Sequence, residues 1–195
     1  LYLKCGLVSV HGPMIESLAN ASDTTKQSLQ DMLLQDQILS FRCQNSVVIH
    51  PGQASGIMAG GNLTTLCHLL GTPFEPDFSG KILLLEDIGE SPYRIDRMLM
   101  QMKLAGCFDH ISGIVLGTFK GCGESDLVYQ IFYDIFSNAR FPILAGFDVW
   151  HDEPNLPIPF GINASIVTAL GMFNMYELQC GNYIVYLTRN TKQRF

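Results

Sequence analysis

The chain has 195 residues, of which 47% are hydrophobic and 15% are charged, and its formal net charge is -6 at pH 7. This composition is typical of a chain that buries a core, which excludes an intrinsically disordered protein. Lysines and arginines are scattered along the sequence, which argues against nucleic acid and anionic membrane as main partners. No apolar run reaches the roughly 18–20 residues needed to span a bilayer.

The six cysteines include no C-x-x-C pair. Their spacing does not indicate a disulfide framework, and no two of them are close enough in sequence to predict a structural zinc site. We therefore expect reduced thiols in a cytosolic protein that binds no metal.

The first segments predict short elements. Residues 1–6 are typical of the last turn of a helix that ends at Gly6, and residues 7–10 predict a strand. Natural chains seldom begin inside a helix, so we expect this chain to be the C-terminal piece of a longer protein. Residues 24–39 predict a helix, and residues 40–45 are typical of a connector at a domain boundary.

A short strand is predicted at residues 47–49, and a glycine-rich segment follows at residues 52–62. This segment lacks both the G-x-G-x-x-G spacing and the following Lys-Ser/Thr of phosphate-binding loops. Its glycines would permit close backbone approach, either to a substrate or within a tight structural turn. In the first case, Asn62 could hydrogen-bond a peptide or a carboxylate.

The most informative stretch is residues 81–97, KILLLEDIGESPYRIDR. Four consecutive aliphatic residues at 82–85 predict a strand that is buried on both faces and carries Glu86 at its C-terminal end. The carboxyl ends of such strands form the crevice where α/β proteins bind ligands. Glu86 is therefore the first candidate catalytic residue.

The residues after Glu86 predict a turn at Gly89 and a helix that is capped by Ser91 and begins at Pro92. Asp87 and Glu90 have several possible roles. Either could bind substrate, be solvated, or pair with Arg94 or Arg97.

The second half of the chain alternates predicted strands and helices, which indicates an α/β or α+β class. A helix that ends at Gly106 is followed by a strand at 114–117, a helix at 127–138, a strand at 142–144, and antiparallel strands at 164–167, 175–179 and 183–188.

His151 is the second candidate catalytic residue. It follows a Phe-Asp-Val-Trp loop and precedes a proline-rich segment that we interpret as irregular. A histidine fixed in such a loop suits general acid–base catalysis, although this context taken alone favours a structural histidine that is hydrogen-bonded in a loop. If Glu86 accepts a hydrogen bond from one ring nitrogen, the other can take a proton from a nucleophile. No serine occupies a G-x-S-x-G elbow, and Ser55 in Gly-Gln-Ala-Ser-Gly is the nearest imitation.

Several segments together resemble the LD-carboxypeptidase family of serine peptidases, which includes the microcin-immunity peptidases. They are His11-Gly12-Pro13-Met14, Gly60-Gly61-Asn62-Leu63, Gly71-Thr72-Pro73, LLLEDIGESPYRIDRML and residues 146–161. The block around Glu86 is the strongest of these, and the match runs over nearly the whole chain.

The resemblance implies a Ser–His–Glu triad on a two-domain fold. An N-terminal Rossmann-like domain would carry the serine, and a β-rich swivelling C-terminal domain with flanking helices would supply Glu86 and His151. Residues 1–45 would then be a remnant of the first domain and residues 46–195 the complete second one. The serine would lie upstream of Leu1, so this piece would be inactive alone. The family's usual glycine before the histidine is Trp150 here.

The implied reaction is hydrolysis of an L,D-peptide bond, with release of the terminal D-Ala from a cytoplasmic murein tetrapeptide during peptidoglycan recycling. No metal or cofactor would be needed, and a homodimer is expected. Glu90 would meet an amino group of the substrate. Two alternatives stay open, namely a metal-dependent hydrolase that uses Glu86, Asp87 and His151, and a peptide-binding module of the same fold without catalysis.

Overall fold

The computed structural model describes residues 2–34, 39–42, 46–147, 149 and 155–176. In these parts of the chain, eight strands form one sheet in the order β2-β10-β9-β4-β5-β6-β7-β3, and β1 pairs with β8. The elements are α1 (Tyr2–Cys5), β1 (Ser9–His11), α2 (Ile15–Leu18), α3 (Asp23–Leu34), β2 (Leu39–Arg42), β3 (Val47–His50), β4 (Gln53–Asn62), α4 (Leu63–His68), β5 (Lys81–Ile88), α5 (Pro92–Leu104), β6 (Gly113–Lys120), α6 (Ser125–Ile135), β7 (Ile143–Ala145), β8 (Ile158–Phe160), β9 (Asn163–Val167), the 3₁₀ turn η1 (Thr168–Leu170) and β10 (Met172–Tyr176).

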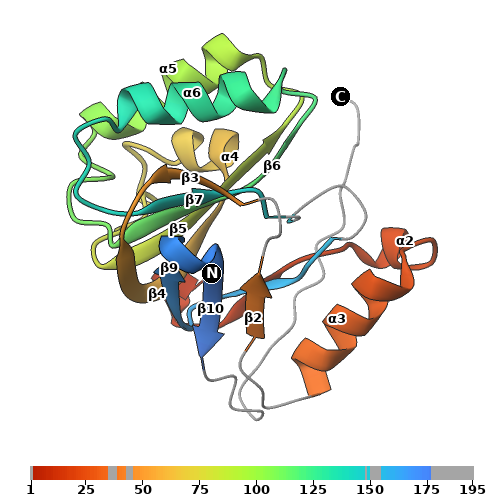
Figure 1. The fold of residues 1–195 in the computed structure, drawn as a ribbon. Helices are drawn as coiled ribbons and strands as arrows, with labels where there is room; N and C mark the ends of the chain where they lie inside the picture. The colour runs from red at the N-terminus through yellow and green to blue at the C-terminus, as the bar shows by residue number, and fades with distance from the viewer. Residues whose placement is uncertain (1, 35–38, 43–45, 148, 150–154, 177–195) are drawn as a thin grey trace, which may run out of the picture.

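The centre of the large sheet is parallel and its margins are antiparallel. Strands β4, β5, β6 and β7 run parallel to one another, whereas β9, β10 and β2 continue the sheet antiparallel on one side and β3 does so on the other. Helices α4, α5 and α6 gather on one face of the sheet, and α3 lies on the other side (Figure 1). This arrangement confirms the α/β class with flanking helices. No helix in the described parts combines the length and the apolar character that crossing a membrane requires.

Strand β5 is the buried centre of the molecule, as its aliphatic run predicts. Leu83 and Leu85 belong to the apolar cluster beneath α4, α5 and α6, whereas Ile82 and Leu84 belong to the cluster on the opposite face. Successive side chains of a strand alternate between its faces, so both faces of β5 are apolar. By the same alternation, Glu86 points to the face of Ile82 and Leu84.

The turn after β5 also follows the sequence prediction. Gly89 has a φ of 72°, a conformation that glycine adopts without strain, and Pro92 occupies the start of α5. Ser91 stands at the N-cap position, but its side chain makes no capping hydrogen bond. Gly106, with a φ of 79°, follows the C-terminal cap of α5.

Two segments predicted to be irregular are strands. Leu39–Arg42 is β2 and pairs with β10 at the edge of the large sheet, although Leu39 was predicted to end a helix and residues 40–42 to lie in a connector. Ile158–Phe160, placed in a proline-rich loop, is β8 and pairs with β1. Pro159 fits there because a strand with a single partner tolerates a residue that has no N–H group.

The glycine-rich segment is also a strand, β4, and its glycines allow β5 to approach closely. A Cβ built on Gly60 would lie 2.1 Å from the carbonyl oxygen of Leu84, and one built on Gly56 would lie 2.5 Å from that of Gly80. The glycines therefore permit a close backbone approach, but it is to the neighbouring strand, and the alternative of a tight structural turn is wrong. Some predictions fall outside the described residues. They are the strands at 177–179 and 183–188 and residues 35–38 of the helix predicted at 24–39.

Candidate active site

Glu86 is fully buried near the C-terminal end of β5, with an exposed fraction of 0%. Within the described residues, neither of its carboxyl oxygens has a hydrogen-bond partner of good geometry. Burial first, and then the charge of Asp87, raise the pKa of Glu86 to about 8, while the Asn62 amide acts in the opposite direction. A buried carboxyl group with this pKa is mostly protonated at neutral pH unless a cation or donor meets it. Perturbed carboxyl groups of this kind are enriched at functional sites.

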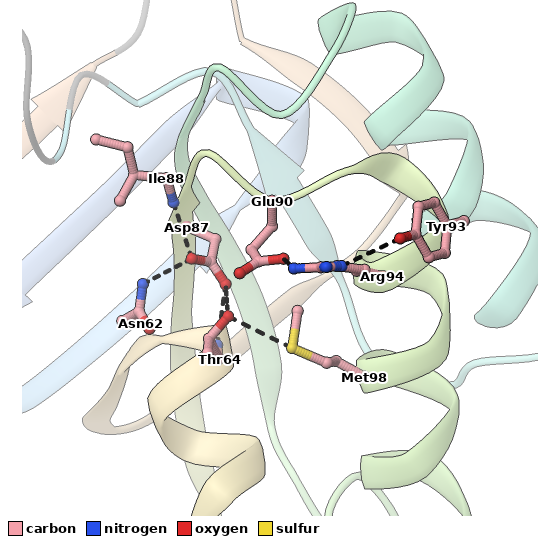
Figure 2. Close-up of polar contacts among 8 residues, drawn as sticks. All are labelled: Asn62, Thr64, Asp87, Ile88, Glu90, Tyr93, Arg94 and Met98. Atoms are coloured by element: carbon pink, nitrogen blue, oxygen red, sulfur yellow. Dashed lines mark hydrogen bonds and ion pairs between the residues drawn. The ribbon is translucent and has the colours of Figure 1, made fainter.

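Asp87 is the next residue of β5, and its carboxylate lies on the opposite face. It is 2% exposed and accepts hydrogen bonds from the Asn62 amide and from the backbone and hydroxyl of Thr64, as Figure 2 shows. It also accepts one from the backbone N–H of Ile88. Asp87 therefore joins β5 to the first turn of α4.

Asn62 ends β4 and is the register partner of Glu86 in the adjacent parallel strand. Its side-chain oxygen accepts a hydrogen bond of 2.9 Å from the backbone N–H of Thr65, which makes it the N-cap of α4. Its amide nitrogen donates to Asp87 over 2.9 Å. These contacts give Asn62 a structural role, and the predicted contact with substrate stays a prediction.

Glu90 lies between the Gly89 turn and the start of α5. Its Oε2 is 3.3 Å from Nη1 of Arg94, and the two side chains are 21% and 50% exposed, respectively (Figure 2). Pairing with Arg94 was one of the roles that the sequence leaves open for Glu90. The partly exposed carboxylate is accessible to a cationic group from outside.

A β-bulge in β6 faces Glu86. Leu85 pairs with Leu116 and Asp87 pairs with Phe119, so two residues of β6, Gly117 and Thr118, stand opposite Glu86 alone. The N–H of Thr118 donates over 3.1 Å to the carbonyl oxygen of Val149 instead of to a neighbouring strand. The bulge thus anchors Val149 on the same face of the sheet as Glu86.

Gly117 is the residue that allows this close packing. A Cβ at this position would lie 3.1 Å from the carbonyl oxygen of Val149 and 3.3 Å from the Cβ of Glu86. Sequence analysis missed Gly117 and Thr118 as site residues. The sequence feature that could have indicated these two residues is a glycine directly after the buried run Ile114-Val115-Leu116.

The structure gives less support to the other candidate catalytic residues, a histidine, a serine and the cysteines. His151 and Trp150 lie outside the described residues. Ser55 is exposed in the first half of β4 and pairs with Ser165, toward the opposite end of that strand from Asn62. Among the described cysteines, burial raises the pKa of Cys67, Cys107 and Cys122, which disfavours a reactive thiolate.

Comparison with known proteins identifies the family of this chain. The sequence model of the LD-carboxypeptidase C-terminal domain matches residues 55–166, more than half of the chain. The chain belongs to the LD-carboxypeptidase family. The matched range of this LD-carboxypeptidase domain contains Asn62, Glu86, Glu90 and Gly117, as well as His151.

Individual relatives agree with this LD-carboxypeptidase assignment. The chain is 37% identical over 179 residues to a probable murein peptide carboxypeptidase of Bacillus subtilis, covering 87% of this chain and 56% of that protein. The crystal structure of a muramoyltetrapeptide carboxypeptidase from Oxalobacter formigenes superimposes with a TM-score of 0.76 at 30% identity, covering 91% of this chain and 64% of that one. The microcin C7 self-immunity protein MccF, in complex with glutamyl sulfamoyl guanosine, does so with a TM-score of 0.79 at 26% identity, covering 91% and 63%. The chain thus spans less than two thirds of each of these proteins.

Proposed function

We propose that the full-length protein is a serine-type LD-carboxypeptidase that releases the terminal D-Ala of a murein tetrapeptide in the cytoplasm, as part of peptidoglycan recycling. The named relatives support the class of substrate. The single observation that carries the proposal is the buried carboxyl group of Glu86, which has no hydrogen-bond partner of good geometry within the described residues.

In the proposed mechanism, Glu86 accepts a hydrogen bond from one ring nitrogen of His151. The other ring nitrogen takes the proton of a serine hydroxyl as that hydroxyl attacks the scissile carbonyl, and gives it to the leaving D-Ala amine as the peptide bond breaks. Water then attacks the resulting acyl-serine ester, and the imidazole takes the proton of the water and returns it to the serine oxygen as the ester bond breaks. The imidazolium formed in the first step stabilises the anion of Glu86 and lowers its pKa. Backbone N–H groups would stabilise the oxyanion.

The packing around Gly117 supports the pairing of Glu86 with His151. Val149, which is held on Thr118 by a hydrogen bond of 3.1 Å, precedes His151 by two positions. Two residues of an extended chain span at most about 7 Å. This short separation is compatible with the proposed contact between the imidazole and Glu86.

The proposed nucleophile belongs to a part of the protein outside these 195 residues. The length of the Bacillus subtilis relative, of which the chain spans 56%, supports an additional domain. Residues 1–45 would belong to that nucleophile domain and residues 46–195 to the domain that supplies Glu86 and His151. We expect the 195-residue chain to be inactive alone, and the full-length protein to be a homodimer.

Substrate contacts are proposed for Asn62 and Glu90. Glu90 is partly exposed beside the Gly89 turn, and its charge suits an amino group of the peptide. The Asn62 amide lies at the end of β4 beside Glu86, and an amide N–H suits a peptide carbonyl or a carboxylate of the substrate.

The geometry favours this proposal over a metal-dependent hydrolase. Glu86 and Asp87 present their carboxyl groups on opposite faces of β5, so they cannot bind one ion together. Asp87 moreover accepts four hydrogen bonds in the described structure.

The direct test is D-Ala release from a murein tetrapeptide by the full-length protein, with a peptide that ends in L-Ala as substrate control. We expect release that survives a chelator and is abolished by a serine-directed reagent, by Glu86→Gln and by His151→Ala. Asp77→Asn, a change of an exposed acid at the other end of β5, should leave the rate unchanged. Binding of the tetrapeptide without release would favour the peptide-binding module, and loss of activity on chelation would favour the metal-dependent hydrolase.

A further inference from the structure

We propose that Asp87 is a positioning residue for this reaction, because it fastens Asn62 and the start of α4 to the end of β5 and so fixes how β5 presents Glu86. The inference rests on the proposed function for its catalytic meaning. Asp87 itself lies on the opposite face of the sheet and would touch neither the substrate nor His151.

Both carboxylate oxygens of Asp87 accept hydrogen bonds. Oδ1 accepts from the Asn62 amide over 2.9 Å and from the backbone N–H of Ile88 over 2.8 Å. Oδ2 accepts from the backbone N–H and the hydroxyl of Thr64 over 2.9 and 2.7 Å. The Thr64 hydroxyl is also 3.4 Å from the sulfur of Met98 on α5 (Figure 2). A single buried side chain therefore ties together β4, α4 and β5, with α5 in contact.

These bonds hold the residue beside Glu86 on the neighbouring strand and the residues that follow Glu86 on its own strand. Asn62 is its register partner on β4, and Asp87 and Ile88 follow it directly on β5. Glu86 makes no hydrogen bond of good geometry within the described residues that would fix its own carboxyl group. The direction of that group is consequently set by the backbone that Asp87 holds in place.

The same carboxylate acts on Glu86 through its charge. After burial, the charge of Asp87 is the second cause of the raised pKa of Glu86. Asn62 on β4 and Gly117 on β6, which lie beside Glu86, carry no charge. Next to Asp87 lie the Glu90–Arg94 ion pair and Cys122, a thiol whose pKa is raised by burial and, further, by the charges of Asp87 and Glu90. Removing the charge of Asp87 should therefore lower the pKa of Glu86.

The test is Asp87→Asn in the full-length protein. We expect kcat to fall about tenfold or more with KM little changed, as for residues that orient a catalytic group. We also expect the acid limb of the pH–kcat profile to move to lower pH, because the Glu86–His151 pair loses a neighbouring negative charge. A residue with a merely structural role would lower activity without moving that limb. Asp77→Asn, which removes an exposed acid that bonds only the N–H of Ser79 in the described structure, is the matched control.

Thr64→Val is the second variant, and it removes the hydroxyl contacts with Asp87 and Met98 while keeping the charge of Asp87. It should lower kcat several-fold and leave the acid limb in place. If Asp87→Asn does not fold, an unchanged kcat in Thr64→Val overturns the inference. If Asp87→Asn folds, an unchanged kcat or an unmoved acid limb overturns it.

A readout without catalysis separates this inference from the proposed function. The carboxyl carbon of Glu86 can be followed by NMR in full-length protein with ¹³C-labelled glutamate, its signal being assigned by its loss in Glu86→Gln. We expect the pKa of Glu86 to be lower in Asp87→Asn than in the wild type. No D-Ala release by the wild type would refute the proposed function, whereas an unchanged pKa of Glu86 in Asp87→Asn would refute the role of Asp87.

Discussion

Gly117 of β6 lies directly against Glu86 of β5: a Cβ on the glycine would be 3.3 Å from the Cβ of the glutamate. It would also be 3.1 Å from the carbonyl oxygen of Val149, which accepts the N–H of Thr118 over 3.1 Å. The missing side chain at position 117 therefore lets both the Val149 backbone and Glu86 pack against this residue of β6.

This relationship predicts the effect of Gly117→Ala. The added methyl group must displace either the Val149 backbone or Glu86, which overpacks the site and should cost about 1–3 kcal/mol of stability. Because the displaced segment leads to His151, we also expect D-Ala release by the folded full-length variant to fall at least about tenfold.

Gly113→Ala is the matched control for that experiment. It lies in the same strand, and its Cβ would lie 2.9 Å from Cδ1 of Ile166 and 3.2 Å from the carbonyl oxygen of Pro142, away from Glu86. It should destabilise the protein to a similar degree with turnover per folded molecule preserved. Equal losses of turnover in both variants would contradict a special role for Gly117.

The pKa of Glu86 predicts a pH-dependent stability when its proposed partner is removed. Burial and the charge of Asp87 raise the pKa of Glu86 from 4.5 to about 8, and both causes remain in His151→Ala, so we expect its folded state to bind more protons than its unfolded state between these values. The free energy of unfolding should therefore fall as pH rises from about 4.5 to about 8, by at most roughly 5 kcal/mol.

Thermal unfolding of His151→Ala across this pH range checks that prediction. The double variant Glu86→Gln/His151→Ala is the control, since a neutral amide removes the titration and should make the profile flatter. Parallel profiles of the two variants would show that Glu86 does not titrate in this range.

Glu90→Ala tests the proposed substrate contact of Glu90. The Glu90–Arg94 pair is partly exposed and spaced i, i+4, so its loss should change stability by less than about 0.5 kcal/mol. If Glu90 meets an amino group of the peptide, KM should rise while kcat changes little.

Arg94→Ala provides the comparison for that variant. It removes the same ion pair and leaves the Glu90 carboxylate in place, so KM should stay the same or fall. An unaltered KM in Glu90→Ala would remove Glu90 from the substrate site.

Sequence reasoning was most accurate where local chemistry decides the structure. The run at 82–85 has the residues of a doubly buried strand, and Gly89, Pro92 and Gly106 mark the turn, the start and the end of the following helix. These features depend on neighbours in sequence, so burial and backbone preference suffice to predict them.

Prediction from the sequence was least accurate where contacts between residues far apart in the chain determine the structure. The glycines of β4 occur in a strand because the backbone of β5 lies where their side chains would be. Pro159 is tolerated in β8 because β8 pairs with a single strand, β1. The roles of Asp87 and Asn62 depend on Thr64 and on the start of α4, which come together only in the folded sheet. No periodicity in the chain encodes these contacts.

The central claim is that Glu86 and His151 meet in the folded protein, and the pKa of Glu86 in the presence and absence of His151 tests it most directly. The measurement is a ¹³C NMR titration of the Glu86 carboxyl group in full-length wild type and in His151→Ala. We predict a lower pKa in the wild type than in the variant, because the imidazole favours the carboxylate, whereas burial and the charge of Asp87 raise the pKa in both proteins. The same pKa in both proteins would contradict the pairing and, with it, the proposed catalytic role of this domain.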